Sequence, residues 1–273
     1  MTAVGNYHRY QGAARHVPDA APSPHIKERR LAVLDGLIPG LFADGSAVLD
    51  VGCNAGAVTV QLAHFYDTGS VTGVDVDPQL IEDAGIYCAF QSSRIRPATA
   101  DSPRQINYFP ISAIHDVGPR IPPLPATDED SGSDAGAGSP LSEATPDLQT
   151  VQFICEDWVI SQNPKTSGPY DVILALSVVK WIHLKHLDAG LEAFFRKCAS
   201  SLKEGGYFVI EVQSWNSYLT AIAPGKTPHF KNALDQLKHR PETSYTELLE
   251  QNKLVHVATS EELPRRISVY RKA

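Results

Sequence analysis

The sequence predicts an α/β fold, in which a doubly wound, mostly parallel seven-stranded sheet carries helices on both faces. Two observations support this prediction. An apolar run at 47–51 ends in an acid and a glycine-rich turn, Gly52 to Gly56, and one βα unit later the run at 70–76 ends in a second acid, Asp75. Strand-like and helix-like patterns then alternate along the chain, as they do in parallel sheets.

Each element has a local reason in the sequence. Apolar residues at helical spacing predict a first helix that Pro39-Gly40 stops, and Pro78 suits the first turn of a later helix. The near-continuous apolar run 170–177 indicates a central strand that is buried on both faces. In chain order we expect helix 26–37, strand 47–51, helix 58–66, strand 70–76, helix 78–90, strands 150–155 and 170–177, helix 188–202, strand 207–212, helices 230–237 and 244–252, and strands 254–259 and 266–271.

The stretch 97–150 interrupts this pattern and predicts a disordered insertion within one domain. It is rich in Pro, Ser, Gly, Asp and Ala, a composition that buries too little apolar surface to fold. It contains eight acidic and two basic residues, so it carries six of the seven net negative charges and the rest of the chain is almost neutral. This balance excludes a protein that coats long nucleic acid by charge alone. The basic residues of the N-terminal segment form either a local patch or a solvated tail; they are Arg9, Arg15, Lys27, Arg29 and Arg30.

The glycine turn predicts the cofactor. Gly52 and Gly56 let the backbone pass close to a ligand, and Asp75 can accept hydrogen bonds from ribose hydroxyls. A dinucleotide site needs a third glycine, in G-x-G-x-x-G, to hold a pyrophosphate at a helix N-terminus. Here Ala57 and Val58 follow the turn instead. We therefore favour S-adenosylmethionine over a nicotinamide or flavin cofactor; a tight turn in an unrelated α/β domain is the third interpretation.

Polar residues also follow the third and fourth strands, where an open α/β sheet collects its functional residues. Asp157 offers an acceptor for an adenine amine, with Trp158 as an aromatic neighbour, although a helix cap beside a core tryptophan is the competing interpretation. The segment 177–181 lacks the [DN]-P-P-[FY] turn of enzymes that methylate adenine amines, which disfavours a nucleobase acceptor. Lys180 in this segment indicates an anionic acceptor such as a phosphate, unless its chain only lies along a packed helix.

Composition limits other functions. The four cysteines are widely spaced and include no C-x-x-C pair, so we expect reduced, buried thiols and no bound metal. The chain shows no signal-peptide pattern and no apolar run long enough to cross a membrane. We therefore expect a soluble, intracellular protein, nuclear or cytoplasmic and monomeric, without a membrane partner. The cysteines are Cys53, Cys88, Cys155 and Cys198.

Four segments together resemble the bicoid-interacting-protein family of RNA methyltransferases. They are GNYHRY at 5–10, LDVGCNAG at 49–56, YDVILALSVVKWIHL at 170–184 and IEVQSWNSY at 210–218. The GNYxxY and KWxHL patterns are not general features of methyltransferases, so the combination is specific. The resemblance implies a Rossmann-like class I methyltransferase fold with an antiparallel final strand. It also implies a methyltransferase domain over 26–273 and an N-terminal arm, 1–25, that contributes to the active site.

The resemblance implies methylphosphate capping of small non-coding RNA, in which S-adenosylmethionine methylates an oxygen of the RNA 5′-terminal phosphate, and it slightly favours the nucleus. An anionic oxygen that attacks in line needs positioning and charge orientation more than a strong base. The implied cofactor contacts are Tyr10, Arg30 or Arg29, Gly52, Cys53, Asn54, Gly56, Asp75, Val76, Asp157, Trp158 and Leu176. The implied catalytic residues toward the RNA end are Lys180, Tyr7, Glu211 and Trp215, with Tyr7 and Tyr10 closing over the site.

The chain departs from the family pattern in three places. Relatives usually read KYYGYR where this chain has RYQGAAR at 9–15, with Gln11 among the changes; NWGD where it has KHLD at 185–188; and EPQPW where it has EVQSW at 211–215. Val212 and Ser214 thus replace two prolines, which can loosen the loop after the fifth strand. Two alternatives stay open: a methyltransferase for another RNA end or a small acid, and a weakly active RNA-binding or stabilising protein with the same fold.

Overall fold

The computed structural model describes residues 28–43, 45–66, 68–96, 101–106, 108–118 and 150–273. The chain divides into two units, residues 1–88 with 149–273 and residues 89–148. Each unit is described by itself. The expected N-terminal arm at 1–25, with Tyr7 and Tyr10, lies outside the described residues.

A mostly parallel sheet forms the centre of the first unit. Its strand order is β3-β2-β1-β4-β5-β7-β6, and β7 is antiparallel to both of its neighbours while the other pairs are parallel. The strand order reverses between β1 and β4, so functional residues are expected at their carboxyl ends. The expected sheet with its antiparallel last strand is confirmed. The seven strands of the described residues are β1 (Ala47–Val51), β2 (Ser70–Asp75), β3 (Thr150–Cys155), β4 (Tyr170–Leu176), β5 (Leu202–Glu211), β6 (Leu254–Thr259) and β7 (Ile267–Lys272).

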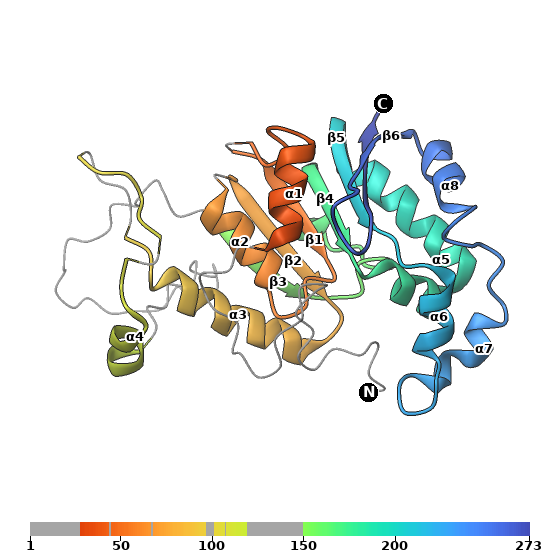
Figure 1. Cartoon of the computed structure of the whole chain (residues 1–273), viewed down its shortest axis with the longest axis horizontal. Helices are drawn as coiled ribbons and strands as arrows, with labels where there is room; N and C mark the ends of the chain where they lie inside the picture. The colour runs from red at the N-terminus through yellow and green to blue at the C-terminus, as the bar shows by residue number, and fades with distance from the viewer. Residues whose placement is uncertain (1–27, 44, 67, 97–100, 107, 119–149) are drawn as a thin grey trace, which may run out of the picture. The chain divides into compact units, whose positions relative to one another are not determined.

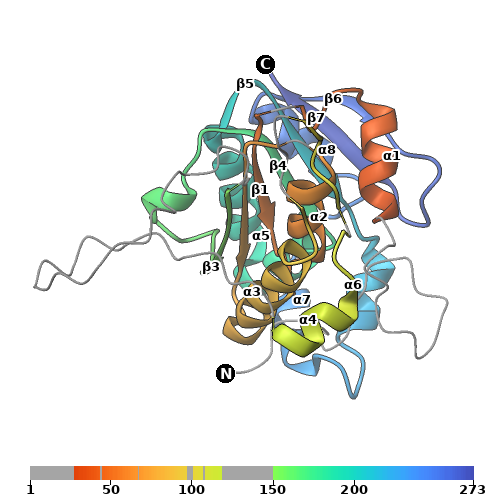
Figure 2. The same cartoon turned by 90° about the vertical axis from the view of Figure 1, so that its left-hand side faces the viewer.

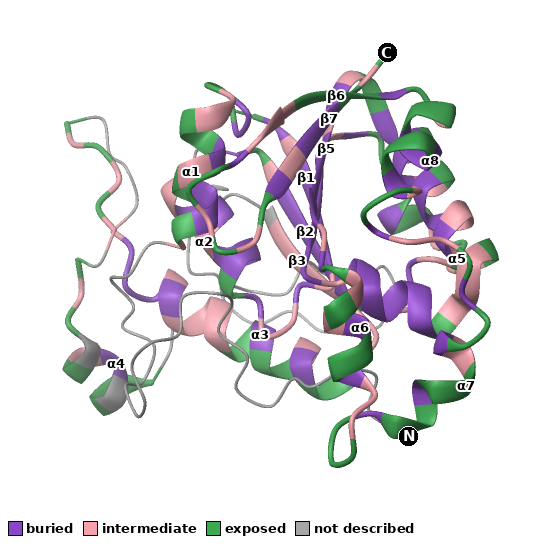
Figure 3. Cartoon of the chain, turned by 45° about the vertical axis from the view of Figure 1, so that its right-hand side comes forward, coloured by how far each residue is buried: buried purple, intermediate pink, exposed green. Residues whose placement is uncertain are grey.

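Helices cover both faces of this sheet, as expected. Alternate side chains of the central strands enter two hydrophobic cores: Leu49 and Ile173 pack in the core of α5 and α8, and Val48 and Leu174 in that of α1 and α2. Burial of each side chain of this size stabilises the folded state by about 1.5–3 kcal/mol relative to exposure to water. Figures 1 and 2 show α2 and α5 on opposite sides of β1, and Figure 3 shows the buried strands between them. The helices named here are α1 (Arg29–Leu37), α2 (Ala57–Phe65), α5 (Val179–Ser201) and α8 (Tyr245–Gln251).

The turn from β1 to α2 adopts a left-handed backbone at three residues. Gly52, Asn54 and Gly56 have φ values of 74°, 52° and 77°. The N–H groups of Gly52 and Cys53 both donate to the carbonyl oxygen of Val74, at 2.8 and 3.1 Å, which joins the turn to the end of β2. A Cβ atom at Gly52 would overlap the side chain of Val178, just after β4. The turn therefore packs against two neighbouring strand ends, which only a glycine permits.

The helices after β4 differ most from the expectation. Helix α5 begins at Val179, well before the expected start at Asp188, and its helical course is broken at Leu187. Helix α6 (Trp215–Ala221) was not expected, and α7 (Lys231–Leu234), which follows a 3₁₀ turn η3 (Pro228–Phe230), is shorter than expected. Another 3₁₀ turn, η2 (Pro164–Thr166), precedes β4. Strand β5 begins at Leu202 rather than at 207, because Leu202 pairs with Tyr170 before a register shift.

The stretch that we predicted as a disordered insertion contains regular structure. Helix α4 (Ile111–Val117) lies within it, and Arg96 and Gln105 exchange backbone hydrogen bonds of 2.9 and 3.0 Å. Local backbone bonds and a short helix thus form at these residues despite the composition, and the disorder of the insertion stays a prediction. Helix α3 (Pro78–Ser92) includes residues of both units. The single interrupted domain stays a prediction.

Two further expectations concern the burial of the cysteine thiols and the absence of a membrane-spanning segment. Cys53 and Cys198 are buried, but Cys155 is exposed. The expectation of a buried thiol is wrong for Cys155, because β3 is an edge strand with a neighbour on one side only. Among the described residues, no helix combines the length and the apolar character needed to span a membrane.

The break in α5 gives a testable prediction. Leu187 has φ 60° and ψ −168°, a backbone region that glycine tolerates and that costs another residue ~1–3 kcal/mol. We expect the free energy of unfolding of Leu187→Gly to exceed that of Leu187→Ala by about 1 kcal/mol, measured by urea denaturation. Both variants remove the leucine side chain, and only glycine relieves the backbone. At an unstrained helical position, an alanine variant is more stable than a glycine variant by roughly 0.5–1 kcal/mol. If Leu187→Ala proved more stable than Leu187→Gly, the backbone at Leu187 would not be strained.

Candidate active site at the carboxyl edge of the sheet

The carboxylate of Asp75 lies at the end of β2 beside the glycine turn. Its Oδ2 accepts the backbone N–H of Asn54 at 3.0 Å, and its Oδ1 accepts that of Asp77 at 3.1 Å. Burial raises the pKa of Asp75, and these two donors oppose the shift. The backbone N–H of Val76 also acts on this carboxylate, and since a carboxylate offers about four acceptor positions, about one remains for a further donor. The arrangement fits a hydroxyl of a ribose.

The other acid of the motif, Asp50, has a structural role. It is buried in β1, and the Thr59 hydroxyl donates to its Oδ2 at 2.7 Å. Burial raises the pKa of Asp50 to about 6. Because Thr59 lies in α2, this bond holds the helix to the strand from which the glycine turn leaves.

The carboxylate of Asp157 lies between two side chains, Lys185 and His186, that sequence reasoning did not single out. Lys185 Nζ and His186 Nε2 approach its Oδ2 at 2.8 and 2.9 Å. Burial works to raise the pKa of Asp157, but the hydrogen bonds and charges of His186 and Lys185 outweigh it and lower the pKa to about 2. Both contacts use Oδ2, so Oδ1 is the oxygen better placed to accept from an adenine amine.

The indole of Trp158 belongs to the core, which corrects the predicted base-binding pair. Its Nε1 donates to the carbonyl of Thr166 at 2.9 Å, and its ring meets Phe194 edge to face. The Lys197 ammonium lies 4.6 Å from the centroid of the ring. Only 2 % of Trp158 is exposed. The competing interpretation, a core tryptophan, is therefore correct for this side chain.

Lys180 is nearly buried at the start of α5. Its Nζ donates to the Ser217 hydroxyl at 2.9 Å and lies 4.5 Å from the centroid of the Trp181 ring. Burial, with the positive charges of Arg265 and Lys226, lowers the pKa of Lys180 to about 8. Lys180 is thus not a solvated lysine on a helix surface, and none of the described groups that act on its ammonium is acidic.

The Glu211 carboxylate connects four parts of the chain. It is 1 % exposed, and its Oε2 accepts from Arg30 Nη1 at 3.1 Å and from the Ser177 hydroxyl. Arg265 Nη1 donates to the Ser177 hydroxyl at 3.0 Å and lies 3.7 Å from Glu211 Oε1. Glu211 is therefore an internal counter-ion that positions its neighbours, and not the RNA-facing catalytic group that the resemblance implied. Arg30, not Arg29, is the arginine of α1 that points inward.

Gln213 fixes the start of α5. Its Nε2 donates to the Ser177 carbonyl at 2.8 Å, and its Oε1 accepts the backbone N–H of Lys180 at 3.4 Å. The segment after β5 is held by these bonds even though it lacks the two prolines of the relatives. At one of the two positions, Ser214, φ is −61°, close to the value that a proline would impose.

The remaining predicted residues lie around this edge. Trp215 stacks on Tyr218 with ring centroids 5.0 Å apart, and the Arg240 guanidinium lies 3.8 Å from the centroid of its indole. Leu176 is buried at the end of β4, and Val76 is partly buried just after β2. Tyr7 and Tyr10 lie outside the described residues.

A buried polar network supports α5 and α6 from behind. His183, fully buried, contacts the Tyr245 hydroxyl at 3.1 Å through Nδ1 and Asp188 Oδ1 at 2.8 Å through Nε2. The hydroxyls of Tyr218 and Tyr245 lie 2.6 Å apart. Burial lowers the pKa of His183 against the pull of Asp188, so the ring is neutral and donates from Nε2. Every member thus has a partner, which buried polar groups require.

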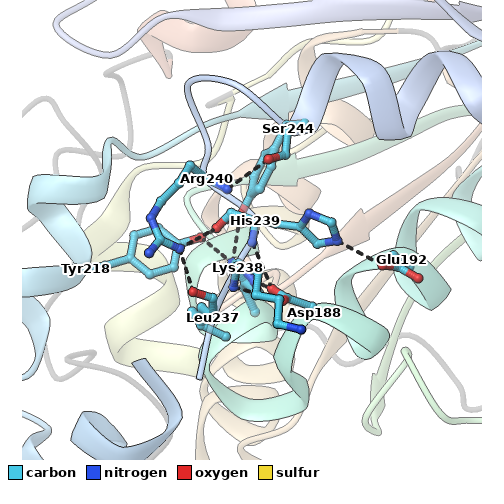
Figure 4. A network of polar contacts seen from close by, with 10 residues as sticks. Asp188, Glu192, Tyr218, Leu237, Lys238, His239, Arg240 and Ser244 are labelled. Atoms are coloured by element: carbon cyan, nitrogen blue, oxygen red, sulfur yellow. Dashed lines mark hydrogen bonds and ion pairs between the residues drawn. The ribbon is translucent and has the colours of Figure 1, made fainter. Parts of the chain in front are cut away.

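Asp188 also ties this network to the chain before α8. Its carboxylate accepts the backbone N–H groups of Lys238 and His239 at 2.9 and 3.2 Å. His239 Nε2 in turn contacts Glu192 Oε1 at 2.8 Å, and the Arg240 guanidinium donates to the Leu237 carbonyl at 2.7 Å (Figure 4). The loop 237–240 is therefore anchored on α5.

The structure brings together most of the predicted residues that it describes. The glycine turn, Asp75 and the segment after β4 meet at one edge, whereas Trp158 and Glu211 point into the protein. Sequence reasoning missed Ser177, Arg265, Lys185 and His186. The only signal for the last two was their place in a segment that departs from the family pattern.

Comparisons with known proteins agree with this geometry. Residues 170–272 match the model of the family "Bicoid-interacting protein 3 (Bin3)". The resemblance to the bicoid-interacting-protein family is confirmed. The matched residues include β4, α5, β5 and β7, and thus Lys180 and the Glu211 cluster.

Two curated relatives of the chain are named for reactions on RNA. A probable RNA methyltransferase of Arabidopsis thaliana is 32% identical over 78% of this chain and 61% of its own length. A 7SK snRNA methylphosphate capping enzyme of Mus musculus is 30% identical over 88% of this chain and 35% of its own length. The chain thus spans less than two thirds of either relative.

A solved structure supports the fold. The N-methyltransferase NodS of Bradyrhizobium japonicum superposes with a TM-score of 0.50 at 13% identity, over 89% of this chain and 94% of that one. The class I methyltransferase fold expected from the sequence is confirmed. The predicted cofactor, S-adenosylmethionine, agrees with the names of these relatives, and the turn at Gly52 with the carboxylate of Asp75 fits it.

The contacts of Asp157 give a pH-dependent prediction. The pKa of Asp157 is about 2, below the ordinary 3.8, so its ionised form stabilises the fold by about 2 kcal/mol above pH 3.8. This contribution is lost as the pH falls through about 2. We expect His186→Phe to raise the pKa of Asp157 toward 3.8, measured by NMR titration of the carboxyl carbon. Lys203→Met, which breaks the exposed pair with Asp171, is the control and should leave it unchanged. An unaltered Asp157 pKa in His186→Phe would contradict the contact.

Proposed function

We propose that this chain transfers a methyl group from S-adenosylmethionine to an oxygen of the 5′-terminal phosphate of an RNA. The observation that supports it most is Lys180, a nearly buried ammonium at the end of β4 with hydroxyl and carbonyl partners but no acidic partner among the described residues. Such a group attracts an anion, and a phosphate oxygen satisfies its charge.

The cofactor would lie along the carboxyl ends of β1 and β2. The backbone at Gly52 to Asn54 would border its methionine part, and the Asp75 carboxylate would accept from a hydroxyl of its ribose. Asp157 Oδ1 would accept from the adenine amine while Lys185 and His186 hold Oδ2. When bound, the cofactor supplies a methyl group on a positively charged sulfur.

The chemistry demands little proton transfer from the protein. A phosphate oxygen is already anionic near neutral pH, so the C–O bond forms as the C–S bond breaks, and sulfur keeps the electron pair. Lys180 would orient the oxygen, which converts binding energy into the geometry of in-line attack. A side chain that acts as a strong base is not required, in keeping with the buried, ion-paired state of Glu211.

Labelled S-adenosylmethionine tests the proposal directly. We expect methyl transfer to RNA that carries a 5′-triphosphate or 5′-monophosphate and none to the same RNA with a 5′-hydroxyl. Transfer that ignores the 5′ end would contradict a phosphate acceptor. Binding of the cofactor and of RNA without any transfer would leave the RNA-binding alternative.

Asp75 and Lys180 should separate cofactor binding from transfer. We expect Asp75→Ala to weaken S-adenosylhomocysteine binding by roughly 1–3 kcal/mol, because hydrogen bonds to a charged acceptor are lost. Lys180→Ala should leave that affinity unchanged and lower kcat/KM for RNA. Calorimetry and steady-state kinetics measure the two effects. Equal cofactor affinity in Asp75→Ala and wild type would overturn the ribose assignment, and unchanged kcat/KM in Lys180→Ala would overturn the role of the lysine.

The location in the nucleus or cytoplasm and the monomeric state stay predictions. The roles of Tyr7 and Tyr10 in closing the site also stay predictions, since both residues lie outside the described part of the chain.

A further inference from the structure

Arg96 uses only one of the two donors on one edge of its guanidinium. Its Nη2 donates to the Ser102 hydroxyl at 2.5 Å. The Nε of the same edge is buried and has no hydrogen-bond partner among the described residues. The guanidinium also lies over the Tyr108 ring, 4.9 Å from its centroid. Buried donors in proteins are nearly always hydrogen-bonded, so an unsatisfied donor beside a hydroxyl indicates a place for a further acceptor.

The backbone holds Arg96 close to this hydroxyl. Arg96 and Gln105 exchange backbone hydrogen bonds of 2.9 and 3.0 Å, which close the loop that contains Ser102. The backbone N–H of Tyr108 donates to the carbonyl oxygen of Arg94 at 2.7 Å, which brings the next segment alongside. All of these residues belong to the unit 89–148. The contact between Arg96 and Ser102 therefore lies within one locally fixed loop.

Ser102 is also placed to be a kinase substrate. Pro103 follows it, and proline-directed protein kinases phosphorylate a serine or threonine that precedes a proline. Ser102 is partly exposed, and Asp101 and Pro103 on either side of it are exposed. In the described part of the chain, Thr227 is the other such residue, but it is 5% exposed and its hydroxyl donates to the Ala221 carbonyl at 2.8 Å. Ser102 is thus the more accessible of the two.

We propose that Ser102 is a phosphorylation site of a proline-directed protein kinase, and that Arg96 binds the resulting phosphate through its Nε and Nη2. The kinase transfers the γ-phosphoryl group of ATP. The bond between Ser102 Oγ and phosphorus forms as the bond between phosphorus and the bridging oxygen breaks, ADP leaves with that electron pair, and the hydroxyl proton passes to a base of the kinase.

The guanidinium of Arg96 suits a phosphate better than it suits the hydroxyl. A phosphoserine carries about −1.5 to −2 charges near neutral pH and three acceptor oxygens. Two of these oxygens can accept from Nε and Nη2 together, as in bidentate arginine–phosphate pairs. The phosphate thus gives the buried Nε the partner that it lacks. Asp101 and Arg104 flank the Ser-Pro pair with opposite charges, so their effects on the phosphate oppose each other.

The sequence provides a matched control serine. Ser139 precedes Pro140 in the same Pro- and Ser-rich stretch. The full chain is incubated with a purified proline-directed kinase and ATP, and mass spectrometry identifies the modified residues. Phosphorus NMR then gives the second pKa of each phosphoserine in wild type, Arg96→Gln and Arg96→Lys. Ser102→Ala and Ser139→Ala identify the two signals.

We expect phosphate on Ser102, with a second pKa about one unit below that of phosphoserine 139, because a nearby cation favours the dianion. Arg96→Gln should reduce this difference to less than about 0.3 unit, and Arg96→Lys should keep part of it, since it retains the charge without the second donor. Concentrated urea should bring the two pKa values of the wild type together. This last measurement decides the matter even if Arg96→Gln folds poorly.

The site and the role of Arg96 can be overturned separately. A full chain without phosphate on Ser102 after kinase treatment would overturn the site. Equal pKa values for the two phosphoserines in the folded wild type would overturn the binding by Arg96. A difference that survives Arg96→Gln or concentrated urea would do the same, because it would then arise from the local sequence alone.

Discussion

The arrangement of the site depends on the buried carboxylate of Glu211. Burying an ion that is only 1 % exposed destabilises the fold by several kcal/mol unless its partners compensate the lost hydration. Loss of a single partner is therefore strongly destabilising. Those contacts come from α1 through Arg30, from the end of β4 through Ser177 and from the β6–β7 turn through Arg265. Segments far apart in sequence are thereby fixed around the point where the sheet order reverses.

The elements that could be predicted are those whose cause is local. The bounds of β1, β3 and β6 agree with the expectation, because apolar runs flanked by turn residues define them. The first half of α5 was missed because its N-cap, Val178, makes no side-chain hydrogen bond and its first residues read as the end of a strand. What makes this segment helical is burial of Trp181 and Leu184 against α6 and α7, a tertiary effect.

The candidate site divides in the same way. Gly52 and Asp75 could be identified because a glycine turn and an acid at a strand end are local signals. Lys180 could be identified because it lies just after the apolar run of β4. Glu211 and Trp158 were assigned to ligands, since sequence alone does not show on which side of a strand end a side chain lies. Arg265 could not be found at all, because it reaches the site from a turn that is remote in sequence from β4.

At 185–188, where the chain departs from the family pattern, the contacts of the neighbouring residues compensate for backbone strain at Leu187. Leu187 occupies a backbone conformation suited to the glycine that relatives usually carry there, and such strain persists only where the surroundings fix the chain. The residues before it are held through Asp157 and the one after it through the His183 network. Gln213 holds the other end of the same helical segment, at Lys180. Since the segment is fixed at both ends, the strained leucine lies in a rigid support for the lysine rather than in a hinge.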